Sequence, residues 1–243
     1  MACRFRPLSH KEDAWHTLVH VCRRWRDVVF GSPRRLDLRL LCMDRRLMKT
    51  LDIWPELPIV IRVDNGRHVQ LPSVTNVVSV LKRHDRVCKM SFGNLPTSFL
   101  EELAMTSEPF PALIELDLAS FQEDTPIFPD SFLGGSVPRL RSLDLWRIPF
   151  PGIGKLLLST RDLVTLSLGS LSHSGYISPG AMVTILSALT RLKSLRLNFH
   201  WQTPEFWTHG RSQHSPALTR VILPALTNFD FSGTSEYLEY IVS

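Results

Sequence analysis

One six-residue pattern, L-x-x-L-x-L, returns along most of the chain at intervals of 23 to 34 residues. Its first, fourth and sixth positions are leucine or another large apolar residue, and the fifth is polar or charged. Side chains alternate between the two faces of a strand, so the fourth and sixth positions share one face and the fifth points to the other. Each copy is therefore predicted to form a short strand with one buried face. The copies begin at Val87, Leu113, Leu140, Leu163, Leu192 and Leu226.

Repetition at this spacing is typical of leucine-rich repeats, in which each unit supplies one strand and one return segment. A single unit cannot bury its apolar face, so consecutive units stack and their strands align in a parallel sheet. The sequence therefore predicts an α/β fold, a leucine-rich-repeat solenoid with parallel strands on the concave face and helices or irregular segments on the convex face. We expect it to span residues 36–243, to be incomplete at its C-terminus, and to follow a short helical segment at residues 1–35.

The segments between the strands carry helix signals. Ser98 and Glu101 form a capping-box pattern that predicts a helix near 98–106. Ser178 before Pro179 predicts a second helix near 179–189, because serine caps a helix start and proline is tolerated in the first turn. Further return segments are predicted at residues 72–84, 152–159, 203–210 and 233–242, and further strands at 36–40 and 59–63.

Two departures from a regular repeat are expected. The segment Phe121 to Gly135 contains Pro126, Pro129 and a glycine pair, which predicts a loop that bulges from the solenoid. The usual template also places asparagine or cysteine three residues after its sixth position, and no copy here has either. We therefore expect irregular turns after the strands.

The outward positions of consecutive strands predict one continuous binding surface. Trp146 is the first choice as an anchor on it, because tryptophan is enriched among residues that dominate interface energies. Asp117 and Asp144, on successive strands, favour a basic partner. For any one of these residues the alternative interpretation is an ordinary solvated strand residue. The candidate substrate-binding residues are Asp117, Asp144, Trp146, Ser167, Arg196, Asn198 and Asp230.

Composition argues for a globular intracellular protein. The chain is 44% hydrophobic and 21% charged, which is ordinary for a folded domain. No apolar stretch approaches the roughly 18–20 residues that a helix needs to cross a bilayer, and residues 1–14 lack the apolar core of a signal peptide. The four cysteines are too sparse for a disulfide framework or a paired metal motif, which indicates reduced thiols and a cytoplasmic or nuclear location. They are Cys3, Cys22, Cys42 and Cys88.

The net charge of +5 is concentrated near the N-terminus, where residues 1–50 hold 12 Lys and Arg against 5 Asp and Glu. Nucleic-acid binding is one interpretation of such a patch, and a solvated helix face is the other. We favour the solvated face, because no nucleic-acid-binding motif accompanies the charge. The sequence does not predict a nucleic-acid or membrane partner.

No catalytic, cofactor or metal site is predicted. Gly152 to Lys155 lacks the earlier glycine and the following Ser or Thr of a phosphate-binding loop, so we interpret it as a helix start. His16 and His20 lie four residues apart, yet two potential ligands do not make a metal site, and His173 has no nucleophile motif around it. Trp201 and Trp207 form an aromatic–histidine cluster with His200, Glu205 and His209. The cluster is either a small pocket, part of a partner surface, or an insertion packed on the solenoid, and we favour packing.

Residues 15–30 form an apolar stripe at helical spacing with arginines opposite, which predicts an amphipathic helix. Within it Val21–Arg26 reads V-C-R-R-W-R, and Gly31, Ser32 and Pro33 follow. This resembles the second half of an F-box, whose usual pattern is V-C-K/R-x-W-R/K. Together with the repeats, the chain is similar to a group of mushroom-type fungal F-box proteins. Three further short segments carry the similarity, at residues 51–55, 133–135 and 233–239.

The resemblance implies a function. The F-box would dock on the Skp adaptor of an SCF-type (Skp, cullin, F-box) ubiquitin ligase, while the repeats would bind an unknown protein substrate. The implied adaptor-binding residues are Leu18, Val21, Cys22 and Trp25. The first half of the module, L-P-x-E-I/V-L, has no counterpart in residues 1–14, so the F-box is partial. The alternative is an interaction scaffold, or a decayed paralogue, that does not bind the adaptor.

Overall fold

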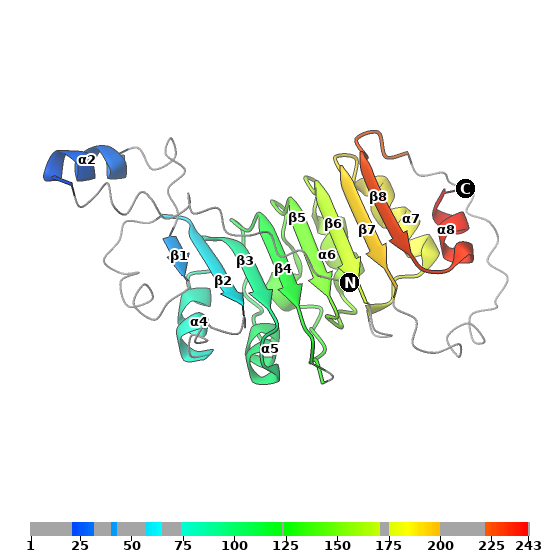
Figure 1. Ribbon diagram of the computed structural model, residues 1–243, viewed down its shortest axis with the longest axis horizontal. Coiled ribbons are helices and arrows are strands. Elements are labelled where there is room, and N and C mark those ends of the chain that lie inside the picture. The colour runs from blue at the N-terminus through cyan, green and yellow to red at the C-terminus, as the bar shows by residue number, and fades with distance from the viewer. Residues whose placement is uncertain are drawn as a thin grey trace.

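The strands of this chain form one parallel sheet in the order in which they occur in the sequence (Figure 1). The computed structural model describes residues 21–31, 40–42, 57–64, 74–122, 124–170, 175–199 and 222–242. Within these ranges the sheet has eight strands, and every neighbouring pair is parallel. The strands are β1 Leu40–Cys42, β2 Ile59–Asp64, β3 Val87–Gly93, β4 Glu115–Ala119, β5 Ser142–Trp146, β6 Thr165–Gly169, β7 Ser194–Asn198 and β8 Asn228–Ser232.

Helices form the return segments and cover one face of the sheet (Figure 1). Consecutive helices pack against each other, as α6 does with α7 and α7 with α8. The first helix, α2, lies beyond the β1 end of the sheet (Figure 1). The helices are α2 Arg23–Gly31, α4 Val74–Leu81, α5 Thr97–Ala104, α6 Ile153–Ser159, α7 Pro179–Ala188 and α8 Ser235–Val242, with a short 3-10 helix, η1, at Phe132–Gly135.

The predicted strand positions and their register are confirmed from β3 to β8. Leu116 is paired with Leu143, and Leu143 with Leu166, so equivalent positions of successive copies lie side by side. Leucines at the fourth and sixth positions point to the helix-covered face, and none of those in β4 to β7 is more than 2% exposed. These residues are Leu116, Leu118, Leu143, Leu145, Leu166, Leu168, Leu195 and Leu197.

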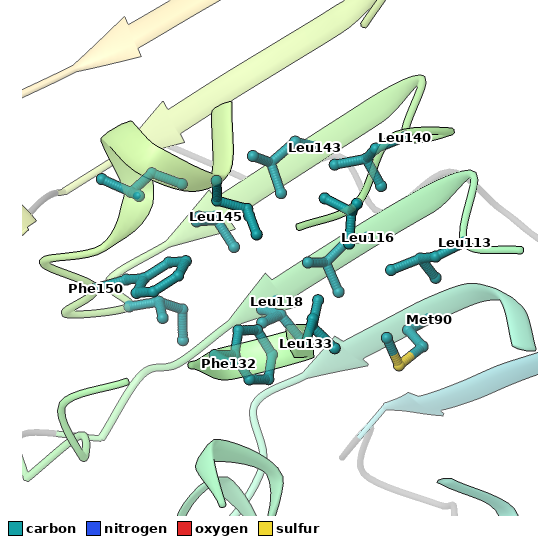
Figure 2. Close-up of a cluster of buried hydrophobic side chains, with 14 of the residues drawn as sticks. Met90, Leu113, Leu116, Leu118, Phe132, Leu133, Leu140, Leu143, Leu145 and Phe150 are labelled. Carbon is teal, nitrogen blue, oxygen red and sulfur yellow. The ribbon is translucent and has the colours of Figure 1, made fainter. Parts of the chain in front are cut away.

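The core runs continuously from one unit to the next. Figure 2 shows leucines of β4 and β5 pointing to the same side, with aromatic and aliphatic side chains of the return segments beside them. At the β8 end of the sheet the inward positions are less buried. Phe229 of β8, which occupies an inward position of the template, is 41% exposed. The reason is its place at the sheet end, since β8 has a neighbouring strand on one side only among the described residues.

A proline-containing turn before three of the strands, β4, β5 and β8, was not anticipated. In three units a proline follows an apolar residue, and the leucine that opens the template donates its N–H to that residue's carbonyl oxygen. The donor–acceptor pairs are Leu113 to Phe110, Leu140 to Val137 and Leu226 to Leu223, each with an N–O distance of 3.1 Å. Proline suits the second position of such a turn because its φ is already set there. An apolar–Pro–x–Leu pattern is thus the sequence signal for the turn.

Directly after the strands the main-chain hydrogen bonding is regular, although the missing asparagines predicted irregular turns. The residue after each strand from β3 to β7 donates its N–H to the last carbonyl of the next strand, as Ser120 does to Trp146 at 3.0 Å and Arg147 to Gly169 at 2.9 Å. Asn94, Arg147 and Ser170 adopt left-handed φ values of 50°, 55° and 52° at this position. The main chain itself makes the inter-unit bonds that a side-chain ladder would otherwise supply.

The segment predicted to bulge as a loop is exposed in part, as at Phe121 and Ile127, but three of its side chains anchor it in the core. Phe128, Phe132 and Leu133 are fully buried, and the Phe128 and Phe132 rings meet edge to face with centroids 4.7 Å apart. Two main-chain bonds hold the segment, from Phe128 N to Pro149 O and from Leu133 N to Thr106 O. The prolines and glycines signalled an irregular backbone correctly, but the apolar residues between them determine where the segment lies.

Helix capping was predicted correctly at one of two places. Ser178 Oγ accepts the Ala181 N–H at the start of α7, as expected. The capping box at Ser98 is wrong: α5 begins one residue earlier, at Thr97, behind Pro96, whose carbonyl accepts the N–H groups of Phe99 and Leu100. Ser98 then lies inside the first turn and makes no cap.

Other expectations hold or lie outside the described ranges. The predicted helices at 72–84, 152–159 and 233–242 correspond to α4, α6 and α8, and β2 matches the predicted strand at 59–63. Residues 36–39, 171–174 and 200–221 are outside the described residues, and with them the Trp201–Trp207 cluster, His173 and the helix predicted at 203–210. Where the structure is described, no helix is both long and apolar enough to span a bilayer.

Candidate interaction surface

The face of the sheet opposite the helices carries a row of polar side chains, called the polar row below. Each member occupies the fifth position of its repeat, and from β3 to β7 it lies between two buried residues. Strand pairing places Ser91 beside Asp117, Asp117 beside Asp144, and so on without interruption to β8. The outward positions of consecutive strands therefore line up, as the repeat pattern predicted. Its members are Ser91, Asp117, Asp144, Ser167, Arg196 and Asp230.

At the β3–β4 end the row is linked by short polar contacts. Ser91 Oγ donates a hydrogen bond to Asp117 Oδ2 at 3.0 Å. In the adjacent outward position Lys89 Nζ lies 2.6 Å from Glu115 Oε1. Side-chain donors on β3 therefore meet both acidic side chains of β4, and the negative charge of β4 is partly balanced within the sheet.

Asp144 lies at the centre of the polar row, in an environment that shifts its pKa. Burial raises the pKa of the Asp144 carboxyl above its ordinary value, while a hydrogen bond with Ser167 and the positive charge of Arg196 lower it in part. Burial disfavours the charged form of a carboxyl group because the carboxylate loses hydration. Asp144 is thus a partly dehydrated acceptor whose remaining hydrogen-bonding capacity faces away from the core.

The β7–β8 end is more open. Arg196 Nε donates to Asp230 Oδ2 at 2.9 Å, and both side chains are more than half exposed. Arg196 therefore has carboxylates on both sides, Asp230 on β8 and Asp144 two strands away on β5. An ion pair this exposed contributes roughly 0–1 kcal/mol, so a partner can exchange it for its own contacts at little cost.

Trp146 does point to the polar face, yet it does not stand free in solvent. Its strand partner is Gly169, and a Cβ atom built on that glycine would overlap the six-membered ring of the indole. The ring therefore covers the Gly169 main chain, and Gly169 is buried beneath it. Asn198, the next candidate, follows Gly169 in register and is partly exposed. Trp146 is a flat, partly exposed aromatic surface rather than a projecting side chain.

One member of the row was missed by the sequence analysis. Arg62 of β2 pairs with Ser91 of β3, so it extends the polar row by a further strand and places a positive charge at its β2 end. The available signal was its position between Ile61 and Val63, both buried, which is the same apolar–polar–apolar triplet as in the later copies. The β2 segment has Pro58 where the later copies have leucine or valine at the first template position, which is why it was counted only as a strand.

The predicted adaptor-binding residues are partly described. Val21, Cys22 and Trp25 are exposed, with Val21 and Trp25 at 63% and 49%, whereas Leu18 lies outside the described residues. Val28 is also exposed, at 59%, while Val29 is buried and Phe30 packs against the core. One side of α2 therefore contacts the protein's own core and another presents large apolar side chains to solvent.

Within the described ranges, no three His, Cys, Asp or Glu side chains are grouped so that they could hold a metal ion. His16 and His20 lie outside those ranges. Comparison with models of known protein families, with curated proteins and with solved structures finds no match to this chain.

Proposed function

We propose that this chain is a leucine-rich-repeat solenoid that binds another protein through the polar face of its sheet, and that it acts by binding rather than by catalysis. The observation that carries the proposal is the polar row, unbroken in register from Arg62 to Asp230, with the Trp146 ring beside it. Donors and acceptors on a rigid sheet fix the orientation of a partner, while an aromatic surface supplies apolar contact area.

Charge and hydration divide this surface into two parts. Asp117 and Asp144 make the middle of the row acidic, and burial raises the pKa of Asp144, so its charged form is costly to keep. A cationic side chain of the partner would relieve that cost, so we propose that a basic residue docks over β4 and β5. Trp146 lies on β5 next to this position and serves as the apolar anchor.

The test uses a partner recovered by cross-linking to the chain, purified, and measured by surface plasmon resonance. Trp146→Ala should weaken binding by about 2 kcal/mol or more, the usual scale for an interface anchor. Leu158→Ala is the matched control, because Leu158 is a half-exposed apolar residue of α6. Equal affinity of the two variants would overturn the assignment of the polar face.

The acidic pair is tested separately, since charge complementarity across an interface speeds association through electrostatic steering. Asp117→Asn together with Asp144→Asn should slow association with a basic partner and reduce its dependence on salt concentration. The dissociation rate should change less than the association rate. An association rate that is unchanged at low salt would contradict a basic docking group.

We further propose that the chain is the substrate-recognition subunit of an SCF-type ubiquitin ligase, working in the cytoplasm or nucleus. This rests on the resemblance of Val21–Arg26 to the second half of an F-box and is supported by the exposure of Val21, just before α2, and of Trp25 and Val28 on α2. Apolar side chains on an exposed helix stripe are what an adaptor groove would cover.

Calorimetry with a Skp-type adaptor tests this role. We expect weak or absent binding by the chain as it is, and rescue when an L-P-x-E-I-L type segment is fused upstream. In the fused chain Trp25→Asp should abolish binding, whereas Met105→Asp, an exposed apolar position on the C-terminal side of α5, should not. Failure of the fused chain to bind would favour the alternative, an interaction scaffold that does not join the ligase.

A further inference from the structure

A groove of about 360 Å³ lies at the N-terminal ends of strands β5, β6 and β7. It belongs neither to the polar row nor to α2. Its walls include Arg141, Asp162, Arg191 and Lys193, with Val164 between them. Three of these five side chains are cationic and one is anionic, so the groove is basic, although residues 51–243 as a whole hold 16 Lys and Arg against 18 Asp and Glu.

Repeat geometry brings the cations together. Arg141, Val164 and Lys193 are equivalent residues, each immediately before its strand, and main-chain bonds of 2.8 Å join Val164 N to Arg141 O and Lys193 N to Val164 O. Neighbouring strands lie about 4.8 Å apart, so the α-carbons of Arg141 and Lys193 are about 10 Å apart across Val164. Two long cationic side chains at this separation can both reach one small ligand placed over Val164.

The main chain around the groove offers few acceptors to a ligand. The Arg141 carbonyl already accepts the N–H groups of Val164 and Thr165, and the Val164 carbonyl accepts those of Lys193 and Ser194. The groove therefore presents mainly side-chain donors. This arrangement disfavours a metal cation, which needs oxygen ligands, and favours an anion.

The charges inside the groove do not cancel. Arg191 Nη1 lies 2.6 Å from Asp162 Oδ1, so the single acid is paired with one of the cations. Arg141 and Lys193 are exposed, and neither forms an ion pair with another described residue. The groove thus holds two positive charges in excess, both directed to solvent.

We infer that this groove binds a phosphate monoester. A monoester carries about −1.5 to −2 charge at neutral pH and three acceptor oxygens, which match two free cations better than a single carboxylate does. The Arg141 guanidinium can donate two parallel hydrogen bonds to one phosphate, and Lys193 contributes a compact charge from the other side. The open side of the groove leaves room for the esterified group.

Isothermal calorimetry with methyl phosphate tests the inference on the intact chain. The double variant Arg141→Gln with Lys193→Gln should bind about tenfold more weakly or worse, because two charge-assisted contacts are lost. The matched control is Arg139→Gln with Arg161→Gln, which removes two exposed cations from the same edge without touching the groove lining. The control should bind like the wild type. Equal losses in both double variants would show only a general charge effect and would overturn the site.

Two further probes define the ligand. Dimethyl phosphate has a similar shape but a single charge, so it should bind several-fold more weakly than methyl phosphate; equal or tighter binding would overturn the assignment to a dianion. A peptide containing phosphoserine is then compared with methyl phosphate. Tighter binding of the peptide identifies a phosphorylated protein as the source, and equal binding identifies a small ester. Both results support a phosphate-binding site in the groove, whereas failure of both probes to bind would overturn it.

Discussion

The indole of Trp146 on β5 lies over the main chain of Gly169 on β6, its partner in the strand register. The contact joins two consecutive repeats on the polar face, whereas the leucines join them on the other. It also explains why a large aromatic residue is tolerated there: the neighbouring position has no side chain. The pair provides a specific test of the surface.

Gly169→Ala should lower the free energy of unfolding by about 1–3 kcal/mol, the usual cost of overpacking, because the new methyl group must displace the ring. In a Trp146→Ala background the same change should be neutral or stabilising, since glycine in a strand is otherwise unfavourable by roughly 0.5–1 kcal/mol. Urea denaturation of the four proteins gives the coupling energy. Equal costs in both backgrounds would contradict the contact.

Leu143→Ala should cost about 2–5 kcal/mol, because Leu143 is fully buried between equivalent leucines on either side and its loss leaves a cavity. Leu158→Ala, at a half-exposed position of α6, should change the unfolding free energy by roughly 0.5 kcal/mol or less. Chemical denaturation measures both. Similar values for the two variants would mean that Leu143 does not lie in the continuous core.

Asp144→Asn should stabilise the protein at neutral pH. Burial raises the pKa of Asp144 in the folded state, so the folded protein binds the proton more tightly than the unfolded chain and loses stability as pH rises through the pKa. Asparagine does not ionise, so this loss of stability does not occur, and its side-chain oxygen can still accept the hydrogen bond from Ser167. The gain should shrink as pH falls through the folded pKa and vanish below the ordinary value of 3.8. Thermal melts at neutral and acidic pH measure it, and a gain that persists in acid would contradict this origin.

Tyr237→Phe should destabilise the C-terminal end by about 1–2 kcal/mol. The Tyr237 hydroxyl of α8 donates to the Ile177 carbonyl at 2.9 Å in a buried position, and the substitution leaves that carbonyl without its partner. Tyr176→Phe is the control, since Tyr176 is 41% exposed and its hydroxyl makes no hydrogen bond among the described residues. Hydrogen exchange localises the effect. Equal changes in both variants would argue against a role for the Tyr237 bond.

The repeat pattern predicted the strands, their register and the buried leucines because the physics involved is local. Alternation within L-x-x-L-x-L decides which side chains point inward, and equivalent segments of successive repeats align when the units stack. For the same reason the polar row from Ser91 to Asp230 could be named in advance. Arg62 was missed because its copy lacks the apolar residue that opens the template, so β2 was not counted as a repeat.

Only the tertiary structure decided what each side chain meets. The sequence places Trp146 on the polar face, but Gly169 lies 23 residues away, and nothing local shows that one covers the other. Phe128 and Phe132 lie among loop-forming prolines and glycines, and burial against Phe150 determines their place. The groove between Arg141 and Lys193 likewise exists because stacking brings equivalent residues of separate repeats side by side. Periodicity along the chain fixes the direction of a side chain, whereas its neighbours, hydration and charge environment depend on contacts between units.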